Sequence, residues 1–125
     1  MELRSIYNCK ICGNTIEVVD AYAPPISCCQ QEMVKLEEQT EDSSVEKHVP
    51  VVEEVDGGIE VTVGSTLHPM LKDHHIVFIE IITENKEVYR QDLTEENEPS
   101  AFFPVNKDTV EKVREYCNIH GLWKA

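Results

Sequence analysis

VPVVEEVDGGIEVTV, residues 49–63, predicts a β-hairpin. Val49–Val55 is the first strand candidate, and Pro50 favours an edge strand or a strand start because proline has no N–H to donate to a ladder. Asp56-Gly57-Gly58 is a turn signal, and Ile59–Val63 alternates apolar and polar residues with a period of two. We therefore expect β structure in this part of the chain.

Further strand candidates follow this hairpin. Ile76–Ile82 is a nearly continuous apolar run, which is typical of a buried strand, and Glu87–Gln91 and Ala101–Val105 are shorter candidates. Strands separated by turn signals at this spacing predict a small β-sandwich. The local pattern leaves Thr109–Tyr116 open, because its valines fit both a helix and a strand.

The first 36 residues have a different character. They hold four of the five cysteines, and so short a segment cannot build a sufficient core without a staple. Residues 37–45 are polar and acidic, which indicates a linker. The expected organisation is a small metal module at 1–36, a linker at 37–45 and a β-sandwich at 46–125.

Composition restricts the possible partners. The chain of 125 residues carries 24 acidic and 11 basic side chains, a net charge of −13. This excess argues against a nucleic-acid partner, whose phosphates require Lys and Arg. No apolar run approaches the roughly 20 residues of a membrane span, and Met1–Arg4 lacks the apolar stretch of a signal peptide. We expect a cytoplasmic protein, in which five cysteines indicate metal or redox chemistry.

Four cysteines form one candidate metal site. Cys9 and Cys12 lie in a C-x-x-C motif, and Cys28 and Cys29 are adjacent. Four thiolates in tetrahedral geometry select zinc or iron. A structural zinc ribbon is the alternative, although an adjacent pair is rare in ribbons, and a disulfide between neighbours would need a strained ring.

The fifth cysteine belongs to a second candidate site. Cys117-Asn118-Ile119-His120-Gly121 places a thiol three residues from an imidazole, and further histidines lie upstream at 48, 68 and 74. Structural zinc sites are usually four-coordinate and rich in cysteine. Four imidazoles and one thiolate instead suit a five-coordinate redox iron with one position open to substrate.

Both candidate metal sites resemble those of known families. Residues 7–14 and 28–33 resemble desulforedoxin and the N-terminal domain of the desulfoferrodoxins, which implies a rubredoxin-like iron on Cys9, Cys12, Cys28 and Cys29. Residues 46–50, 68–70, His74 and 117–121 are similar to the active-site motifs of the superoxide reductase family. That resemblance implies an immunoglobulin-like β-sandwich, and with it a strand at Thr109–Tyr116.

The resemblance also implies roles for single residues. His48, His68, His74 and His120 would be equatorial ligands of a second iron, and Cys117 its axial thiolate. Glu46 would be the sixth ligand of the oxidised iron, and Lys47 would lie beside the open position to guide the anion. His74 is preferred over His75 because it lies six residues after His68, which leaves His75 as a surface or partner-facing imidazole.

The implied activity is the one-electron reduction of superoxide to hydrogen peroxide by a homodimer with two irons in each chain and a rubredoxin-like electron donor. Two other hypotheses remain: a non-catalytic iron electron-transfer protein and a zinc-stapled interaction module. The sequence leaves open whether the first iron relays electrons or only staples the fold.

Overall fold

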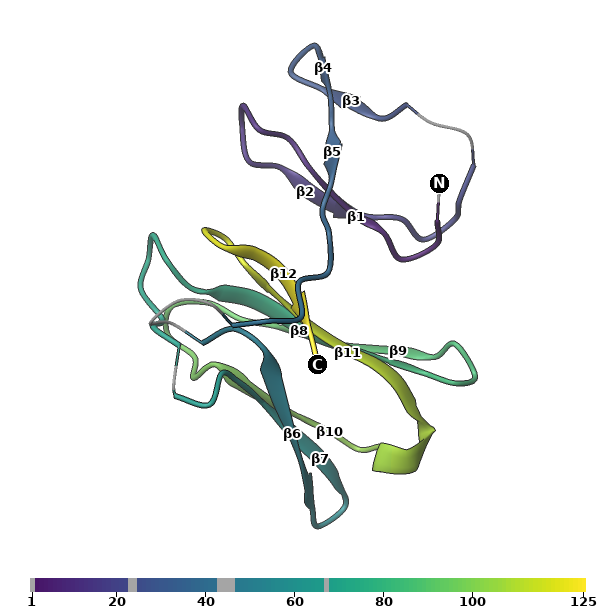
Figure 1. Ribbon diagram of the computed structural model, residues 1–125, viewed down its shortest axis with the longest axis vertical. Helices are drawn as coiled ribbons and strands as arrows, with labels where there is room; N and C mark the ends of the chain where they lie inside the picture. The colour runs from purple at the N-terminus through teal and green to yellow at the C-terminus, as the bar shows by residue number, and fades with distance from the viewer. Residues whose placement is uncertain (1, 23–24, 43–46, 67) are drawn as a thin grey trace. The chain divides into compact units, whose positions relative to one another are not determined.

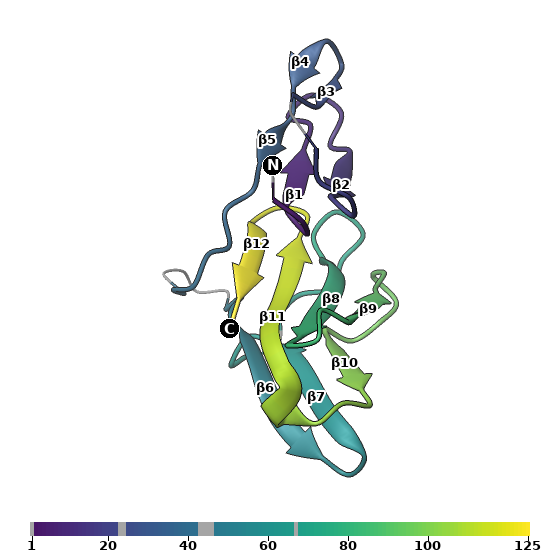
Figure 2. The same ribbon diagram turned by 90° about the vertical axis from the view of Figure 1, so that its right-hand side faces the viewer.

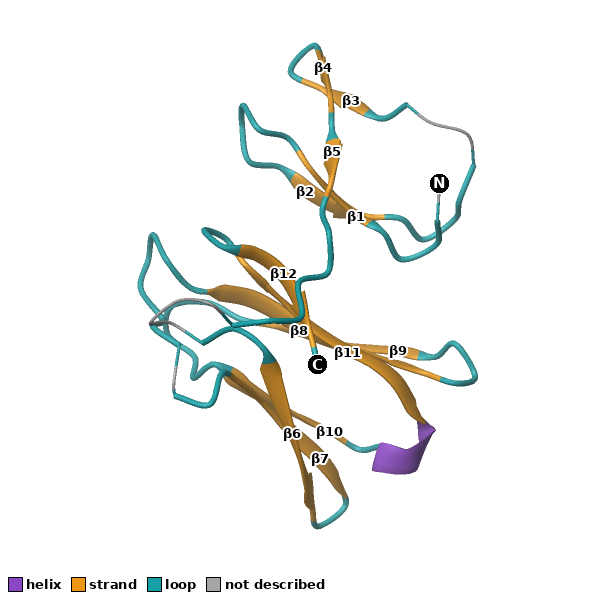
Figure 3. Ribbon diagram, in the orientation of Figure 1, coloured by secondary structure: helices purple, strands orange, loops and turns teal. Residues whose placement is uncertain are grey.

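The computed structural model describes residues 2–22, 25–42, 47–66 and 68–125, and the chain divides into two compact units, Met1–Glu37 and Glu38–Ala125. Nearly every element is a strand, as predicted (Figure 3). Within the described ranges, the one helix is the short 3-10 turn η1, Lys107–Thr109. No helix in those ranges is long and apolar enough to cross a membrane.

The first unit is built from very short strands. A three-stranded antiparallel sheet has the order β2-β1-β5, and a separate hairpin pairs β3 with β4. The bounds are Ile6–Asn8 for β1, Thr15–Glu17 for β2, Ser27–Cys28 for β3, Gln31–Glu32 for β4 and Val34–Lys35 for β5. Among its described residues, the buried apolar side chains are few: Ile6, Cys9, Val18 and Met33. This small core agrees with the expectation that the segment needs a staple.

The second unit is a sandwich of two antiparallel sheets, which are visible as separate layers in Figure 1 and are seen more nearly face on in Figure 2. One sheet has the order β10-β7-β6 and the other β12-β11-β8-β9. The bounds are Pro50–Val55 for β6, Gly58–Val63 for β7, Ile76–Thr83 for β8, Val88–Asp92 for β9, Ser100–Phe103 for β10, Val110–Cys117 for β11 and Gly121–Lys124 for β12. The predicted sandwich is therefore confirmed, and Pro50 begins an edge strand.

The core of the sandwich lies between these two sheets. Its fully buried members include Ile59, Val61 and Val63 on β7 and Ile79 and Ile81 on β8. Their period of two is what the sequence pattern predicts for strands with one face inward. Each such side chain contributes about 1.5–3 kcal/mol relative to an exposed one.

The segment with the ambiguous pattern forms β11. It pairs along its length with β8, and the register shifts between Tyr116 and Cys117, so that Val77 of β8 is passed over. Irregularities of this kind re-aim side chains and often lie beside active sites. Here the shift falls at Cys117, the last residue of β11.

The predicted linker contains residues that bond to the second unit. Glu38 forms ion pairs with Lys112 and Arg114, at 2.9 and 3.1 Å. The backbone of Gln39 pairs beside β12, since Gln39 N donates to Leu122 O at 3.0 Å and Lys124 N donates to Gln39 O at 2.9 Å. Composition predicts a linker at 37–45, and within it Glu38–Asp42 lies along the sandwich, because Glu38 meets basic side chains and Asp42 accepts from backbone amides there.

Candidate metal centres

Two clusters of potential metal ligands are present, one in each unit. In the first unit, the Sγ atoms of Cys9, Cys12, Cys28 and Cys29 all lie within 4.8 Å of one another. Cys9 follows β1, Cys12 lies in the turn toward β2, and Cys28 and Cys29 lie at the end of β3. The structure thus brings together the four cysteines that the sequence grouped.

The hydrogen bonds around these thiols favour a bound cation. Backbone amides of Cys12 and Ile11 lower the pKa of Cys9 to about 6. Hydrogen bonds with the thiols of Cys12 and Cys9 raise the pKa of Cys29 to about 12. One thiol therefore ionises readily while its neighbour resists, since adjacent thiolates repel. A divalent or trivalent metal would offset this repulsion and hold all four as thiolates.

The turn that carries Cys29 has an unusual backbone. Cys29 and Gln30 have φ of 52° and 60° and form the two-residue connection between β3 and β4. Two positive φ angles are the signature of a type I′ hairpin turn, which favours Asn-Gly or Gly-Gly. Residues with a Cβ cost roughly 1–2 kcal/mol each in this region. The turn is therefore strained, and ligation of a metal by Cys29 would hold it in this conformation.

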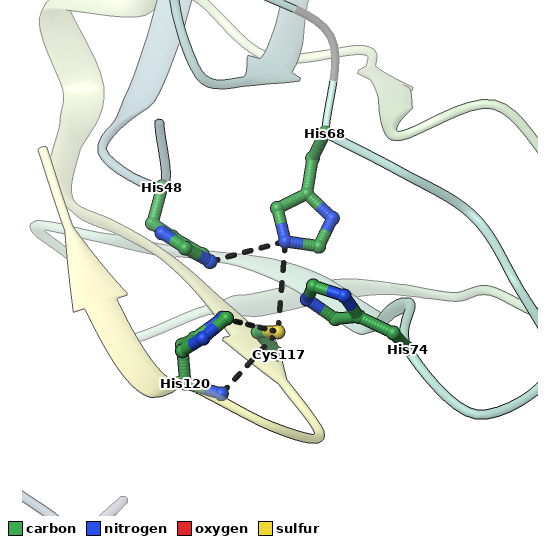
Figure 4. A group of neighbouring side chains, drawn as sticks. All are labelled: His48, His68, His74, Cys117 and His120. Carbon is green, nitrogen blue, oxygen red and sulfur yellow. Dashed lines mark hydrogen bonds between the residues drawn. The ribbon is translucent and has the colours of Figure 1, made fainter. Parts of the chain in front are cut away.

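The second cluster lies at one end of the sandwich and draws on several loops (Figure 4). His48 lies two residues before the start of β6, His68 and His74 lie in the connection from β7 to β8, and Cys117 ends β11. His120 lies in the turn between β11 and β12. The five ligand atoms all lie within 4.8 Å of one another.

The four imidazoles form a closed ring around a common centre. Going around this ring, neighbouring centroids are 4.7 Å apart for His48–His68, 4.8 Å for His68–His74, 5.0 Å for His74–His120 and 4.8 Å for His120–His48. Cys117 Sγ lies 3.6 Å from His68 Nε2 and 3.9 Å from His120 Nδ1. Figure 4 shows the sulfur among the imidazoles.

These separations fit a single metal ion. Two nitrogens at right angles and about 2.1 Å from an ion would lie about 3.0 Å apart. His48 Nε2 and His68 Nε2 are 3.0 Å apart. His68 Nδ1 lies 2.7 Å from Pro69 O, so this nitrogen carries the proton and Nε2 is the ligating atom. Four imidazoles and one thiolate leave an octahedral ion one further position.

The cluster is buried on one side only. His48, His68 and Cys117 are buried, whereas His74 is half-buried and His120 is exposed. A small solute can therefore approach past the two outer imidazoles while the thiolate stays protected from solvent. Such an arrangement suits a reactive metal centre rather than a closed structural one.

Backbone contacts fix the loops that carry the histidines. Asn118 Oδ1 accepts from His75 N at 2.9 Å, and Asn118 Nδ2 donates to Asp73 O at 3.0 Å, so both neighbours of His74 are tied. Asp42 Oδ1 accepts from His48 N at 2.6 Å. The sequence does not predict these roles of Asn118 and Asp42, because contacts to backbone atoms leave no residue pattern.

Of the other residues singled out from the sequence, the structure describes Lys47 and His75 but not Glu46. Glu46 lies outside the described residues. Lys47 is partly exposed and directly precedes His48, and its carbonyl lies against Gly64. His75 lies outside the five-ligand cluster, with its Nδ1 2.9 Å from Leu71 O.

A buried carboxyl beside the second cluster was not anticipated. Glu115 is fully buried two residues before Cys117, and neither of its oxygens has a hydrogen-bond partner in the described part of the chain. Burial, and then the nearby Asp42 carboxylate, raises its pKa well above the usual range. Burial therefore favours the neutral form of Glu115, and a neutral carboxyl two residues before Cys117 would add no second negative charge near its thiolate.

Comparisons with known proteins agree with both clusters. The model of the desulfoferrodoxin family matches residues 40–125, and the model of the desulfoferrodoxin N-terminal domain matches residues 1–36. A desulfoferrodoxin of Syntrophotalea carbinolica is 46% identical and covers 99% of this chain and 97% of its own. A desulfoferrodoxin homolog of Methanothermobacter thermautotrophicus is 48% identical, with 98% of each chain covered.

Proteins named superoxide reductases are also similar. That of Pyrococcus horikoshii is 35% identical, over 74% of this chain and 95% of its own. The crystal structure of the superoxide reductase from Treponema pallidum matches with a TM-score of 0.78 and 28% identity, and covers 97% of this chain and 96% of that one.

Proposed function

Because the chain belongs to the desulfoferrodoxin family, we propose that it is a superoxide reductase with two irons in each chain. The observation that supports this most directly is the ring of four imidazoles with one thiolate, partly open to solvent. His48, His68, His74, His120 and Cys117 would hold the reactive iron. Cys9, Cys12, Cys28 and Cys29 would hold the other.

The reaction needs one electron and two protons to convert superoxide into hydrogen peroxide. Iron held by the second cluster would supply the electron and a position for the anion. The chain supplies neutral imidazoles and a single thiolate, so that a divalent ion there keeps a net positive charge. The Pro69 carbonyl helps by fixing the proton of His68 on Nδ1. Cys117 would donate electron density to the metal.

Lys47 would counter the charge of the protein as a whole. The net charge of −13 repels superoxide, but exposed charges are screened over about 8–10 Å. An ammonium group in the residue before His48 acts at shorter range, so it can steer the anion and hold a water molecule that delivers a proton. Glu46 would occupy the sixth position of the oxidised iron.

The first site and the partners belong to the same proposal. A small redox protein of the rubredoxin kind would re-reduce the iron. Leu3, Val19, Tyr22 and Val34 are exposed apolar side chains on the first unit, which is consistent with a homodimer formed through that unit. The first iron would serve as a staple for the strained cysteine turn, as an electron relay, or as both.

The decisive experiment measures both metal content and product stoichiometry. Purified protein is reduced, mixed with superoxide, and assayed for hydrogen peroxide. A reductase yields one hydrogen peroxide for each superoxide consumed, whereas dismutation yields one for every two. Zinc in both sites, or reduced iron that does not consume superoxide, would leave only the interaction-module or electron-transfer hypothesis.

A further inference from the structure

His120 is a candidate ligand whose orientation must be held by contacts with other residues. It is the exposed ligand of the five, and it lies in the short turn Asn118–His120. An exposed imidazole on a turn has rotational freedom that a metal site cannot tolerate. The carbonyl of His120, however, accepts two N–H groups: Gln39 Nε2 at 2.9 Å and Trp123 Nε1 at 3.1 Å. Both lone pairs of this carbonyl are therefore used.

Trp123 also contacts the neighbouring imidazole. Its indole ring stacks on His48, with centroids 4.8 Å apart and planes inclined by 13°. His48 and His120 are adjacent members of the ligand ring, with centroids 4.8 Å apart. Trp123 is buried, so the stacked face of His48 is closed to water. One side chain thus constrains two adjacent ligands, one through its ring and one through its backbone.

Gln39 is itself held without the help of its side chain. Its backbone pairs with Leu122 and Lys124 beside β12, at 3.0 and 2.9 Å. The same short segment reaches Asp42, which accepts from the backbone of His48. Gln39 Nε2 also lies 3.3 Å from Leu122 O. A substitution that keeps the backbone and removes the side-chain amide should therefore leave the segment in place and release the carbonyls of His120 and Leu122, of which Leu122 keeps its bond from Gln39 N.

We propose that Gln39 and Trp123 are positioning residues that set the orientation of His48 and His120 in the second metal centre. The inference rests on the proposed function only in requiring that a metal binds there. Loss of either N–H frees the turn that carries His120, and this changes the ligand field and weakens retention of the metal. Loss of comparable second partners of metal ligands typically costs roughly 10–100-fold in metal affinity.

The test uses the full-length, iron-loaded chain. Gln39→Met removes the amide at nearly constant volume, Gln39→Glu removes the N–H donors but keeps a polar group, and Trp123→Phe keeps a ring to stack on His48 but has no N–H. Gln91→Met is the matched control, because Gln91 is exposed on β9 and, within the described ranges, its side chain bonds only to the neighbouring Asp92 carbonyl.

The readouts are the electron paramagnetic resonance spectrum of the oxidised protein and the rate at which a chelator removes iron from each site. We expect the ferric signal of the His–Cys site to shift in all three variants and its iron to leave roughly 10–100-fold faster. The ferric signal of the four-cysteine site in the same sample should not change. Gln39→Met combined with Trp123→Phe should lose iron faster than the product of the single effects predicts.

Spectra and rates like those of wild type in the Gln39 variants and in Trp123→Phe would overturn the proposal. Failure of both Gln39 variants to fold would also overturn it, since Gln39 would then determine the fold rather than the placement of a ligand. Superoxide consumption by wild type is measured separately. A wild-type protein with the ferric signal but no reaction with superoxide refutes the proposed function and leaves the positioning test intact.

Discussion

Gly64→Ala should damage the second metal centre through the backbone of its neighbours. Gly64 has φ of +81°, and a Cβ built there would overlap the Lys47 carbonyl oxygen and lie 2.7 Å from Thr66 O and 2.9 Å from Lys47 C. Thr66 O must retreat by about 0.7 Å, from 2.7 Å to the 3.4 Å at which ordinary van der Waals contact begins, and the overlapping Lys47 carbonyl oxygen must retreat further. Lys47 and His48 move with that backbone.

Gly57→Ala provides the matched control. Gly57 has nearly the same φ, +83°, but its Cβ would meet nothing closer than a ring carbon of Phe102 at 3.9 Å. Both changes cost about 1–2 kcal/mol for a left-handed alanine. Gly64→Ala adds the cost of overpacking, about 1–3 kcal/mol. A unit of this size loses roughly 4–8 °C in Tm for each kcal/mol, so Gly64→Ala should melt at least that far below the control.

The assay compares the melting temperature and the bimolecular rate with superoxide for the two variants. A shift approaching 1 Å at reacting groups can cost about 100-fold in rate, so Gly64→Ala should react far more slowly than Gly57→Ala. Equal rates and equal melting temperatures in the two variants would refute the argument. They would show that Gly64 is needed only for its positive φ, and that its close contact with Lys47 affects neither stability nor the reaction rate.

The other predictions concern single ligands and turns. Cys117→Ser should abolish reduction of superoxide while the visible spectrum of the four-cysteine site survives, because the one thiolate donor of the second site is lost; near-normal turnover would exclude Cys117 as a ligand. Lys47→Ala should slow the reaction by roughly 10–10³-fold and weaken its dependence on ionic strength, as measured by pulse radiolysis at several salt concentrations. Gln30→Gly should slow metal loss from the first site, since glycine relieves one left-handed position of a strained turn; chelator kinetics no slower than wild type would contradict this reading. Cys12→Ser should loosen the first unit, as seen by hydrogen exchange, yet leave single-turnover reactivity with superoxide, because the second site has all its ligands in the other unit.

Strong local signals made the hairpin and the ligand groups predictable. The turn at Asp56–Gly58 fixed the limits of β6 and β7 nearly to the residue. By contrast, β11 was locally ambiguous, because its strand form depends on a ladder with β8 that is distant in sequence. β12 has four residues and the strands of the first unit two or three, too few to show a period.

The supporting parts of the second site were hidden for a related reason. Asp42 and Gln39 lie in a segment whose composition suggests a linker, yet they act on the backbone of His48 and His120. Trp123 acts through a ring stack and a carbonyl. Such contacts depend on where distant backbone atoms meet, which neither periodicity nor motif spacing encodes.

The spread of the ligands along the chain sets the order in which the two metals can be captured. The four cysteines fall between positions 9 and 29, so a nascent chain can enclose its first metal as soon as that short segment leaves the ribosome. The five donors of the other centre span positions 48 to 120 and converge only when β11 has paired with β8. Closing loops of that length must precede capture. Metal insertion would therefore be part of folding for the first centre and a step of maturation, after synthesis is nearly complete, for the second.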